Sequence, residues 1–301
     1  MDALGRVLLA ERPAGKHLAG YWEFPGGKVE PGELPLEGLA RELQEELGIE
    51  LVSAEPLIRI PWRYDNRQLL LDAWRIDRWK GELQSLEGQA LQWCVPAEVD
   101  PQLMTPADRP ILQALRLPAV YVVTPARAKP DDLPKWYERI DRAIRESGTR
   151  LLQLNLPLWA TKSVRALAKQ LLPVANEHGC QILLSGDLEG ALEIGAGVHL
   201  TIEQLNQAPA RPLSWQQLIG VSCADASQLQ AASWRGADFA MILPMAAADH
   251  VSPDWDAFHV LVEAASLPIY AQVGSYDLAS VALAKRHGAQ GIAPSGAVWT
   301  K

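Results

Sequence analysis

The chain has 301 residues, with 28 Lys and Arg against 36 Asp and Glu and a net charge of −8. This length exceeds the usual single hydrophobic core, so we expect two domains. The acidic balance, without a run of basic residues, excludes a general binder of nucleic-acid polymers, because such proteins must displace counterions from phosphates. Three widely spaced cysteines, Cys94, Cys180 and Cys223, predict neither a disulfide nor a zinc site. With no basic and apolar leader and no apolar stretch of spanning length, we expect a cytoplasmic protein that acts on a small molecule.

The first predicted elements are a short strand, a glycine-rich loop and a helix. Residues 6–10 read as the strand, and the glycines at 26, 27 and 32 interrupt any regular pattern. Apolar residues then recur at helical spacing until Gly48 ends the helix: Leu36, Leu39, Ala40, Leu43 and Leu47.

The polar face of this helix carries three carboxylates. Glu42, Glu45 and Glu46 stand at positions i, i+3 and i+4, so they share the face opposite the leucines. Magnesium takes oxygen ligands, including substrate phosphate oxygens, so this face suits a metal-bridged polyphosphate. Arg41 is placed to hold one of the carboxylates, and Glu33 to cap or orient the loop. The alternative is an ordinary solvated helix face with charge pairs.

The same stretch resembles the Nudix hydrolase family, and within it the MutT-like branch of 8-oxo-dGTP diphosphatases. Trp22 to Lys28 is similar to the loop of that branch, and the likeness runs from about Leu4 to Leu115. It implies an α/β/α sandwich with a mixed sheet, and a Mg²⁺ cofactor with Mn²⁺ as the alternative. The implied metal ligands are the Gly26 carbonyl, Glu42, Glu45, Glu46 and, from a later loop, Glu87. The matching family positions are Gly27, Glu33, Arg41, Glu42, Leu43, Glu45, Glu46, Gly48 and Ile49.

We place the first domain at residues 1–117. Its remaining predicted elements are a strand at 68–76 and a short amphipathic helix between Pro106 and Leu117. Related Nudix chains carry a full strand ahead of the segment that corresponds to residues 2–6, and here that first strand is missing. We interpret this as a misplaced start site, because losing a central strand would leave the hydrogen bonds of its neighbours unpaired. A weakened or inactive hydrolase is the alternative.

The implied reaction is hydrolysis of a nucleoside triphosphate, most of all 8-oxo-dGTP, to the monophosphate and pyrophosphate. Magnesium would neutralise the phosphates and activate a water, and either Glu42 or Glu87 would accept its proton. The resemblance places Arg12 and Lys28 at the phosphates and Phe24 and Arg67 in the base pocket. No nucleic-acid polymer or membrane partner is expected, and the oligomeric state stays open.

Base specificity depends on Asp108, which stands where MutT-like enzymes have an Asn. An amide both donates to and accepts from the oxidised purine, whereas an ionised carboxylate only accepts and would repel O6. A protonated Asp108 would restore both bonds if burial raised its pKa. Alternatively, Asp108 only begins the final helix as its N-cap.

The second domain, residues 119–301, has a different pattern of apolar residues. Eight short apolar runs alternate with helical stretches, as a small (β/α)8 barrel of the TIM type requires. A flat, doubly wound sheet is the alternative architecture. The runs are residues 120–123, 151–154, 181–184, 197–200, 218–221, 239–242, 268–271 and 291–293.

This half resembles thiamine-phosphate synthase and its TenI-like relatives, through strings such as Gly197-Val198-His199-Leu200 and Gly220-Val221-Ser222. Basic groups that handle pyrophosphate are replaced, at Asn155, at Ser185-Gly186-Asp187 and in the loop from Met245 to His250. We therefore predict a degenerate binding or interaction module. At the mouth of the barrel we expect the side chains of Gln153, Asp187, His199, Ser222 and Ser295. Two pairs, Gly274-Ser275 and Ser295-Gly296, would lie where barrels often bind a phosphate. His199 is interpreted as a hydrogen-bonded structural residue.

Two other functions remain open. In the first, the Nudix-like half hydrolyses a thiamine-related pyrophosphate and the barrel binds the product. In the second, the missing strand has abolished hydrolysis and the chain is an inactive binding protein.

Overall fold

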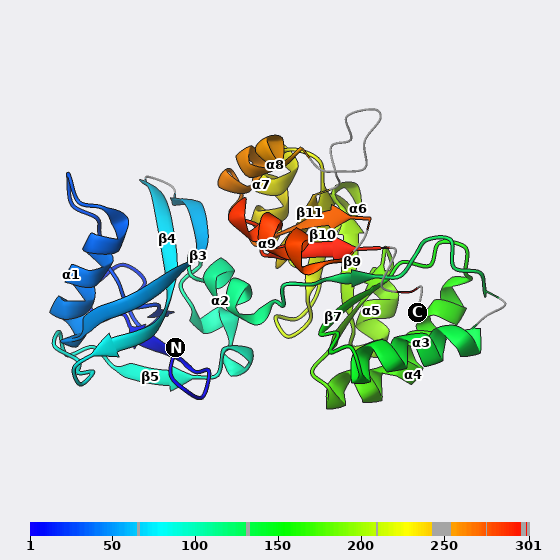
Figure 1. The fold of residues 1–301 in the computed structure, drawn as a ribbon, viewed down its shortest axis with the longest axis horizontal. Helices are drawn as coiled ribbons and strands as arrows, with labels where there is room; N and C mark the ends of the chain where they lie inside the picture. The colour runs from blue at the N-terminus through cyan, green and yellow to red at the C-terminus, as the bar shows by residue number, and fades with distance from the viewer. Residues whose placement is uncertain are drawn as a thin grey trace. The chain divides into compact units, whose positions relative to one another are not determined.

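The computed structural model describes residues 1–64, 67–130, 133–208, 210–242, 254–274, 276–295 and 299 (Figure 1). The chain divides into two compact units, Met1–Arg116 and Leu117–Lys301. Leu117 joins the second unit, because its carbonyl accepts from Gln290 Nε2 at 2.7 Å and its side chain packs beside Tyr121. Among the described residues, no helix has the length and apolar character needed to cross a bilayer.

The first unit combines two antiparallel sheets with two α-helices. The three-stranded sheet has the order β2-β1-β5, and the second is a long hairpin of β3 and β4. The mixed character expected for this unit is seen in a parallel bridge between Trp22 and Met104. Its strands are β1 (Val7–Glu11), β2 (Trp22–Glu23), β3 (Glu50–Tyr64), β4 (Arg67–Lys80) and β5 (Leu91–Cys94). Its helices are α1 (Pro35–Leu47) and α2 (Arg109–Arg116), with 3₁₀ turns η1 (Pro96–Glu98) and η2 (Pro101–Leu103).

Helix α1 forms where the leucine spacing predicted it. Pro35 stands in the first turn, where its missing N–H costs nothing, and Glu37 accepts from Leu34 N at 3.0 Å. Gly48 ends the helix in the left-handed conformation, with φ of 70°. Leu43 and Leu47 are buried against Ile49 and Trp79, so the opposite face of α1 is left to its glutamates.

Helix α2 is shorter than predicted, because it begins at Arg109 and not at Pro106. Thr105 to Asp108 form a turn closed by the Asp108 N–H and the Thr105 carbonyl at 3.0 Å. The Asp108 carbonyl then accepts from Leu112 N, also at 3.0 Å, which starts the helix.

The second unit is a barrel of eight parallel strands in sequence order, β6 to β13. Tyr121 N donates to the Ile292 carbonyl at 2.9 Å, and Ile292 N to the Ala119 carbonyl at 3.0 Å, so the last strand returns to the first. This closure confirms the barrel and excludes the flat sheet. A side chain at Gly291 would meet the Ala119 carbonyl oxygen at 1.9 Å, so only glycine fits the seam. The strands are β6 (Val122–Val123), β7 (Leu151–Leu154), β8 (Gln181–Ser185), β9 (Gly197–Thr201), β10 (Ile219–Cys223), β11 (Phe239–Ile242), β12 (Ile269–Val273) and β13 (Gly291–Pro294).

Buried side chains fill the barrel and pack its helices against the strands. The interior holds an aromatic cluster of Tyr121, Phe239 and Tyr270, whose ring centroids lie 5.1 to 5.5 Å apart. Outward-facing strand residues such as Leu152 and Ile182 pack against helices such as α3 and α4. The helices are α3 (Leu133–Arg145), α4 (Thr161–Glu177), α5 (Leu188–Ile194), α6 (Ile202–Gln207), α7 (Ala226–Trp234), α8 (Trp255–Glu263) and α9 (Leu278–Arg286).

Candidate functional site

The glycine-rich loop lies directly against helix α1. The Lys28 N–H donates to Glu42 Oε1 at 3.0 Å, and the Gly26 N–H donates to Glu46 Oε2 at 3.3 Å. A Cβ at Gly27 would lie 2.0 Å from the carboxyl carbon of Glu42. Glycine is therefore required at position 27 for the loop to approach the carboxylates this closely.

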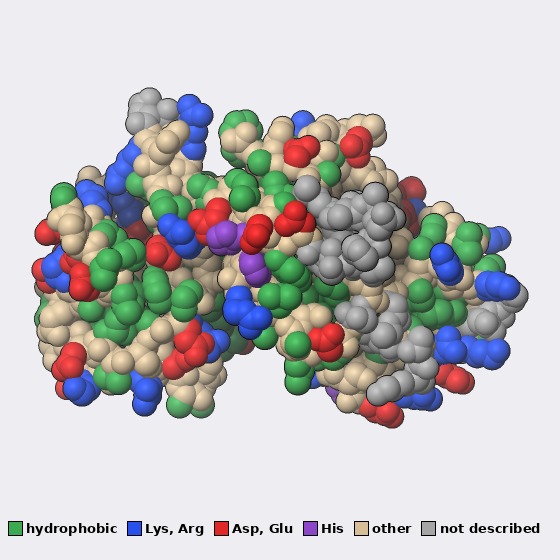
Figure 2. Space-filling view, turned by 45° about the horizontal axis from the view of Figure 1, so that its top comes forward, with side chains coloured by type: hydrophobic (Ala, Val, Ile, Leu, Met, Phe, Trp, Pro, Cys, Tyr) green, Lys and Arg blue, Asp and Glu red, His purple; other side chains and the backbone are tan. Residues whose placement is uncertain are grey.

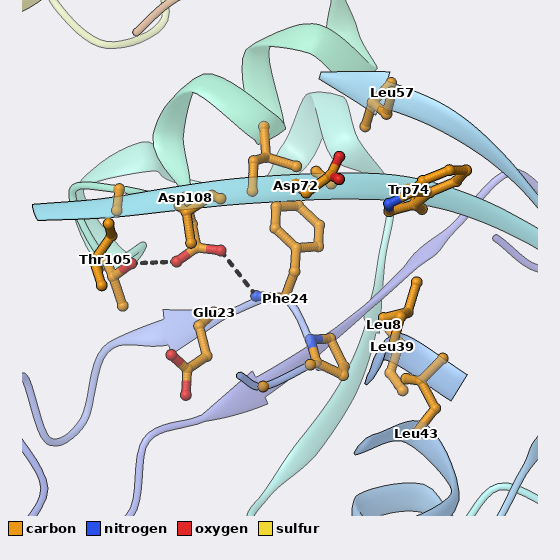
Figure 3. A pocket seen from close by; sticks show the side chains of 18 of the residues that line it. Leu8, Glu23, Phe24, Leu39, Leu43, Leu57, Asp72, Trp74, Thr105 and Asp108 are labelled. Atoms are coloured by element: carbon orange, nitrogen blue, oxygen red, sulfur yellow. Dashed lines mark hydrogen bonds between the residues drawn. The ribbon is translucent and has the colours of Figure 1, made fainter. Parts of the chain in front are cut away.

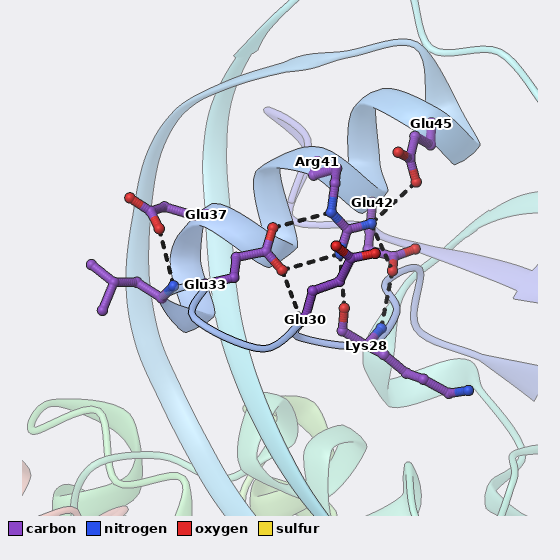
Figure 4. A network of polar contacts seen from close by, with 8 residues as sticks. Lys28, Glu30, Glu33, Glu37, Arg41, Glu42 and Glu45 are labelled. Carbon is purple, nitrogen blue, oxygen red and sulfur yellow. Dashed lines mark hydrogen bonds and ion pairs between the residues drawn. The ribbon is translucent and has the colours of Figure 1, made fainter.

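Arg41 organises the loop and the helix face (Figure 4). Its guanidinium donates to both oxygens of Glu33, at 3.0 and 3.2 Å, and to the Lys28 carbonyl at 2.8 Å. It also donates to Glu42 at 3.1 Å and to Glu45 at 3.2 Å. These bonds raise the pKa of Arg41, and the hydrogen bonds from Arg41 hold the pKa of Glu33 below its usual value. Arg41 thus holds three carboxylates, where the sequence predicted one.

Glu46 has the most perturbed carboxyl group of the helix face. Burial, and then the negative charges of Glu87, Glu42 and Glu23, raise its pKa to about 7. The hydrogen bond from Gly26 N opposes this rise. A carboxylate that is crowded by other anions is stabilised in its charged form by a nearby cation.

The proposed metal ligands are gathered here but do not converge on one point. Within the described residues, no three His, Cys, Asp or Glu side chains are arranged to hold a metal ion. Glu45 is turned to Arg41, and Glu87 pairs with Lys16 at 3.6 Å. Both glutamate side chains are more than half exposed, so they are free to rotate. Oxygen donors at a crowded anionic site suit Mg²⁺, which keeps waters and binds through a few carboxylates and phosphates.

A cavity of about 1220 Å³ opens beside the loop (Figure 3). Its apolar part is lined by side chains that include Leu8, Leu39, Leu43, Leu57 and Trp74. The polar part is lined by Arg12, His17, Glu23, Phe24, Lys28, Tyr64, Arg67, Thr105 and Asp108. The cavity therefore joins the loop of the carboxylate site to a polar and aromatic chamber.

Asp108 connects α2 to the loop. Its Oδ1 accepts from the Phe24 N–H at 3.2 Å, and its Oδ2 accepts from the Thr105 hydroxyl (Figure 3). Burial raises the pKa of Asp108 to about 6, an effect that these two hydrogen bonds oppose. The side chain thus faces the cavity and strand β2, while the backbone carbonyl starts α2. Both readings of Asp108 stay predictions: burial raises its pKa beside the cavity, as a base-reading role requires, and its carbonyl stands at the start of α2.

The remaining predicted residues line the same cavity. Arg12 forms an ion pair with Glu23 and donates from Nε to the His17 carbonyl at 2.7 Å. Arg67 begins β4, opposite Tyr64. Lys28 is exposed and extends away from the Arg41 cluster (Figure 4). Sequence reasoning missed Glu23, Tyr64 and Thr105, although Glu23 lies within the loop whose pattern was recognised.

Comparison with known proteins decides the family of the first unit. The NUDIX domain model matches residues 1–115. CTP pyrophosphohydrolase of Escherichia coli K12 is 46% identical over 110 residues, which cover 36% of this chain and 82% of that protein. The chain is a Nudix hydrolase. The 8-oxo-dGTP diphosphatase of the same organism is 34% identical over 110 residues, covering 36% of this chain and 85% of the relative. Nudix hydrolases are enzymes that cut diphosphate linkages.

The second unit of this Nudix hydrolase belongs to another family. The thiamine monophosphate synthase model matches residues 120–298, more than half of the chain, so the chain also belongs to that family. A thiamine phosphate pyrophosphorylase structure from Pyrococcus furiosus is 21% identical, covers 59% of this chain and 85% of its own, and has a TM-score of 0.46.

Inside the barrel of the Nudix hydrolase, polar side chains on several strands form hydrogen bonds with one another. His199 contacts the Tyr121 hydroxyl through Nδ1 at 3.0 Å and Ser222 Oγ through Nε2 at 2.9 Å. Burial lowers the pKa of His199 to about 3, so the imidazole stays neutral, and its two contacts fit the structural role predicted from sequence. Gln153 Nε2 donates to Ser185 Oγ at 2.7 Å.

The prediction that Asp187 joins this group is wrong. Its carboxylate accepts two hydrogen bonds of 2.7 Å from Arg165 of α4 and one of 3.0 Å from Gly190 N, so it caps α5. Arg165 holds the pKa of Asp187 below its usual value. The expectations for Ser275, Gly296 and the Met245 to His250 loop lie outside the described residues.

Proposed function

We propose that the chain hydrolyses nucleoside triphosphates to the monophosphate and pyrophosphate, with Mg²⁺ or Mn²⁺ as cofactor. One observation carries the proposal: the glycine-rich loop, whose Gly26 and Lys28 N–H groups bond Glu46 and Glu42 of α1, also lines the cavity that holds Phe24 and Asp108. A diphosphate at the carboxylates would place the attached base in that chamber. The volume of about 1220 Å³ exceeds that of ordinary small-molecule sites, so it admits a nucleotide.

The metal would be held by the Gly26 carbonyl and by carboxylates of Glu42, Glu45, Glu46 and Glu87. When bound, it would supply neutralisation of phosphate charge and activation of water. The chain's own part is to position these groups: Arg41 holds Glu42 and Glu45, and the Gly26 N–H holds Glu46. Glu42 or Glu87 is the proposed proton acceptor, and Arg12 and Lys28 are proposed phosphate contacts.

For the base, the contacts of Asp108 favour a cytidine nucleotide. A pKa of about 6 leaves this carboxyl mainly ionised at pH 7, so it acts as an acceptor. The exocyclic amino group of cytosine donates to a carboxylate, whereas O6 of an oxidised guanine is repelled by it. 8-Oxo-dGTP is the second candidate, and it requires Asp108 in its protonated form. Both substrates occur in the names of the curated relatives.

The test is pyrophosphate release from CTP, dCTP, 8-oxo-dGTP and dGTP, and orthophosphate release from thiamine diphosphate, in the presence of Mg²⁺. We expect CTP or dCTP to give the highest kcat/KM at pH 7.5. Preference for 8-oxo-dGTP would reverse the assignment of the base. Turnover of thiamine diphosphate alone would support the thiamine-related alternative. No release from any of these compounds, by a folded protein with Mg²⁺ or Mn²⁺, would refute the proposed hydrolase.

A further inference from the structure

The loop between β1 and β2, residues 12–21, is fixed beside the cavity by its own contacts. Arg12 Nε donates to the His17 carbonyl at 2.7 Å, and the Gly20 N–H donates to the Arg12 carbonyl at 3.0 Å. Leu18 has a φ of 60°, a left-handed conformation that a leucine rarely adopts. His17 and Leu18 both line the cavity. The loop therefore holds its neighbouring residue, Lys16, near the substrate chamber.

Lys16 points to the carboxylate site. Its Nζ lies 3.6 Å from Glu87 Oε2, and Glu87 is in turn close enough to Glu46 to raise the pKa of that carboxyl. The Lys16 and Glu87 side chains are 58% and 51% exposed. An ion pair this long and this exposed contributes little to stability, so it exchanges readily for a stronger partner.

The two arginines of the site are held more firmly. Arg41 bonds three glutamates at 3.0 to 3.2 Å, and Arg12 is paired with Glu23 and tied to the His17 carbonyl. In this structure both guanidinium groups bond the protein's own groups, and Arg12 can contact a phosphate, as proposed above, only from this fixed position. Lys16 has a long flexible stem, and its ammonium is a strongly hydrated point charge suited to a mobile phosphate.

We propose that Lys16 binds the two terminal phosphates of the nucleotide substrate, which leave as pyrophosphate. The proposal rests on the proposed function, in which Glu87 turns to the metal and leaves the Lys16 ammonium without its present partner. The ammonium donates charge-assisted hydrogen bonds to the phosphate oxygens. Lys16 is thus a substrate-binding residue that the recognised loop and helix pattern, from Trp22 to Ile49, does not include.

The experiment measures binding of inorganic pyrophosphate with Mg²⁺ to the full chain by calorimetry, and inhibition of nucleotide hydrolysis by pyrophosphate. We expect Lys16→Gln to weaken both about tenfold, the loss of one hydrogen bond between charged groups. Lys16→Arg, which keeps the charge, should recover most of the affinity. Lys80→Gln is the matched control, because Lys80 is an exposed lysine that pairs with Glu50 at 2.9 Å in the same unit.

Unchanged pyrophosphate affinity in Lys16→Gln would overturn the proposal. Tighter binding or faster hydrolysis would also overturn it, because Lys16 would then only restrain Glu87. Failure of the proposed function is a separate result: no nucleotide would release pyrophosphate even from the wild type. The calorimetric comparison of Lys16→Gln with Lys80→Gln decides the role of Lys16 in that case too.

Discussion

At the scale of single residues, the site depends on how each carboxyl group is held. Arg41 fixes Glu33, Glu42 and Glu45 in the described structure, whereas Glu46 is enclosed and crowded by other anions. Of these glutamates, Glu33 has a lowered pKa and Glu46 a raised one. Substitutions that remove one charge without changing shape can separate these roles.

Glu45→Gln should abolish hydrolysis and leave the fold intact. The side chain is 59% exposed and bonds only to Arg41 among the contacts described, so its amide should change stability by less than ~0.5 kcal/mol. Losing one electrostatic stabiliser should reduce kcat at least ~10²-fold. Steady-state kinetics and thermal unfolding measure the two effects, with the exposed Glu50→Gln as control. A variant with more than a tenth of wild-type activity would contradict the role of Glu45 as a metal ligand.

Asp108 should make stability depend on pH. Its folded-state pKa of about 6 lies above the value of 3.8 for an unperturbed Asp, so the folded protein favours the protonated acid. This stabilisation is fully present below pH 3.8 and is lost as pH rises through 6. Relative to Asp108→Asn, which does not titrate, the wild type should lose about 2 kcal/mol of unfolding free energy between pH 4 and pH 7.

Denaturant unfolding of both proteins at several pH values measures this difference, and groups that titrate alike in both proteins cancel. A difference that does not change with pH would show that the pKa of Asp108 is ordinary.

The same substitution tests which base the site prefers, because an amide both donates and accepts hydrogen bonds. We expect Asp108→Asn to raise the use of 8-oxo-dGTP relative to CTP.

At the scale of elements, the approach of the loop to α1 determines the site. Position 27 has no room for a side chain beside Glu42, and position 26 places its N–H on Glu46. The catalytic geometry therefore depends on the backbone of one element meeting the side chains of the next.

Gly27→Ala should push the loop away from α1. The added methyl group would overlap the Glu42 carboxyl group, a forced shift of the kind that costs ~1–3 kcal/mol. We expect lower thermal stability and at least a tenfold loss of activity. In Gly27→Ala/Glu42→Ala the overlap is gone, so stability should recover while activity stays lost. Full activity in Gly27→Ala alone would show that the close approach is dispensable.

At the scale of the whole molecule, the chain joins two units with separate cores. The second unit contains a buried ion pair: Arg211 Nη2 lies 2.9 Å from Asp238 Oδ2, and the two side chains are 9% and 2% exposed. Asp238 also accepts from Ile219 N at 2.7 Å, so its charge helps to fix the start of β10. The residues of the proposed hydrolase site, in contrast, all belong to the first unit.

Arg211→Met should destabilise the barrel by about 3–5 kcal/mol, because it leaves the buried Asp238 carboxylate without its cation. Calorimetry of the full chain should show the loss in the transition of the second unit, and hydrolysis at 25 °C should be unchanged. Arg145→Met is the control, since Arg145 pairs with Asp141 on the surface at 3.1 Å. Equal effects of the two variants would contradict the importance of burial.

The sequence alone determined the helices and strands whose patterns are formed by residues close together in the chain. Helix α1 follows from leucines at helical spacing and from Gly48, and its three glutamates share a face because of helical geometry. The eight barrel strands follow from short apolar runs between helical stretches, since parallel strands are buried on both faces. The residue pattern also indicated Arg41 and Glu33, and the family resemblance added Gly26; the structure brings all three together around α1.

Only the tertiary structure decided how distant residues meet. Asp108 accepts from Phe24, 84 residues away, and this long-range contact directs its side chain to the cavity. Asp187 follows a strand as expected, yet its carboxylate bonds Arg165 of α4 and caps α5. Local patterns fix backbone conformation, because it depends on near neighbours in the chain. The direction and pKa of a polar side chain depend on the charges and burial that folding brings to it.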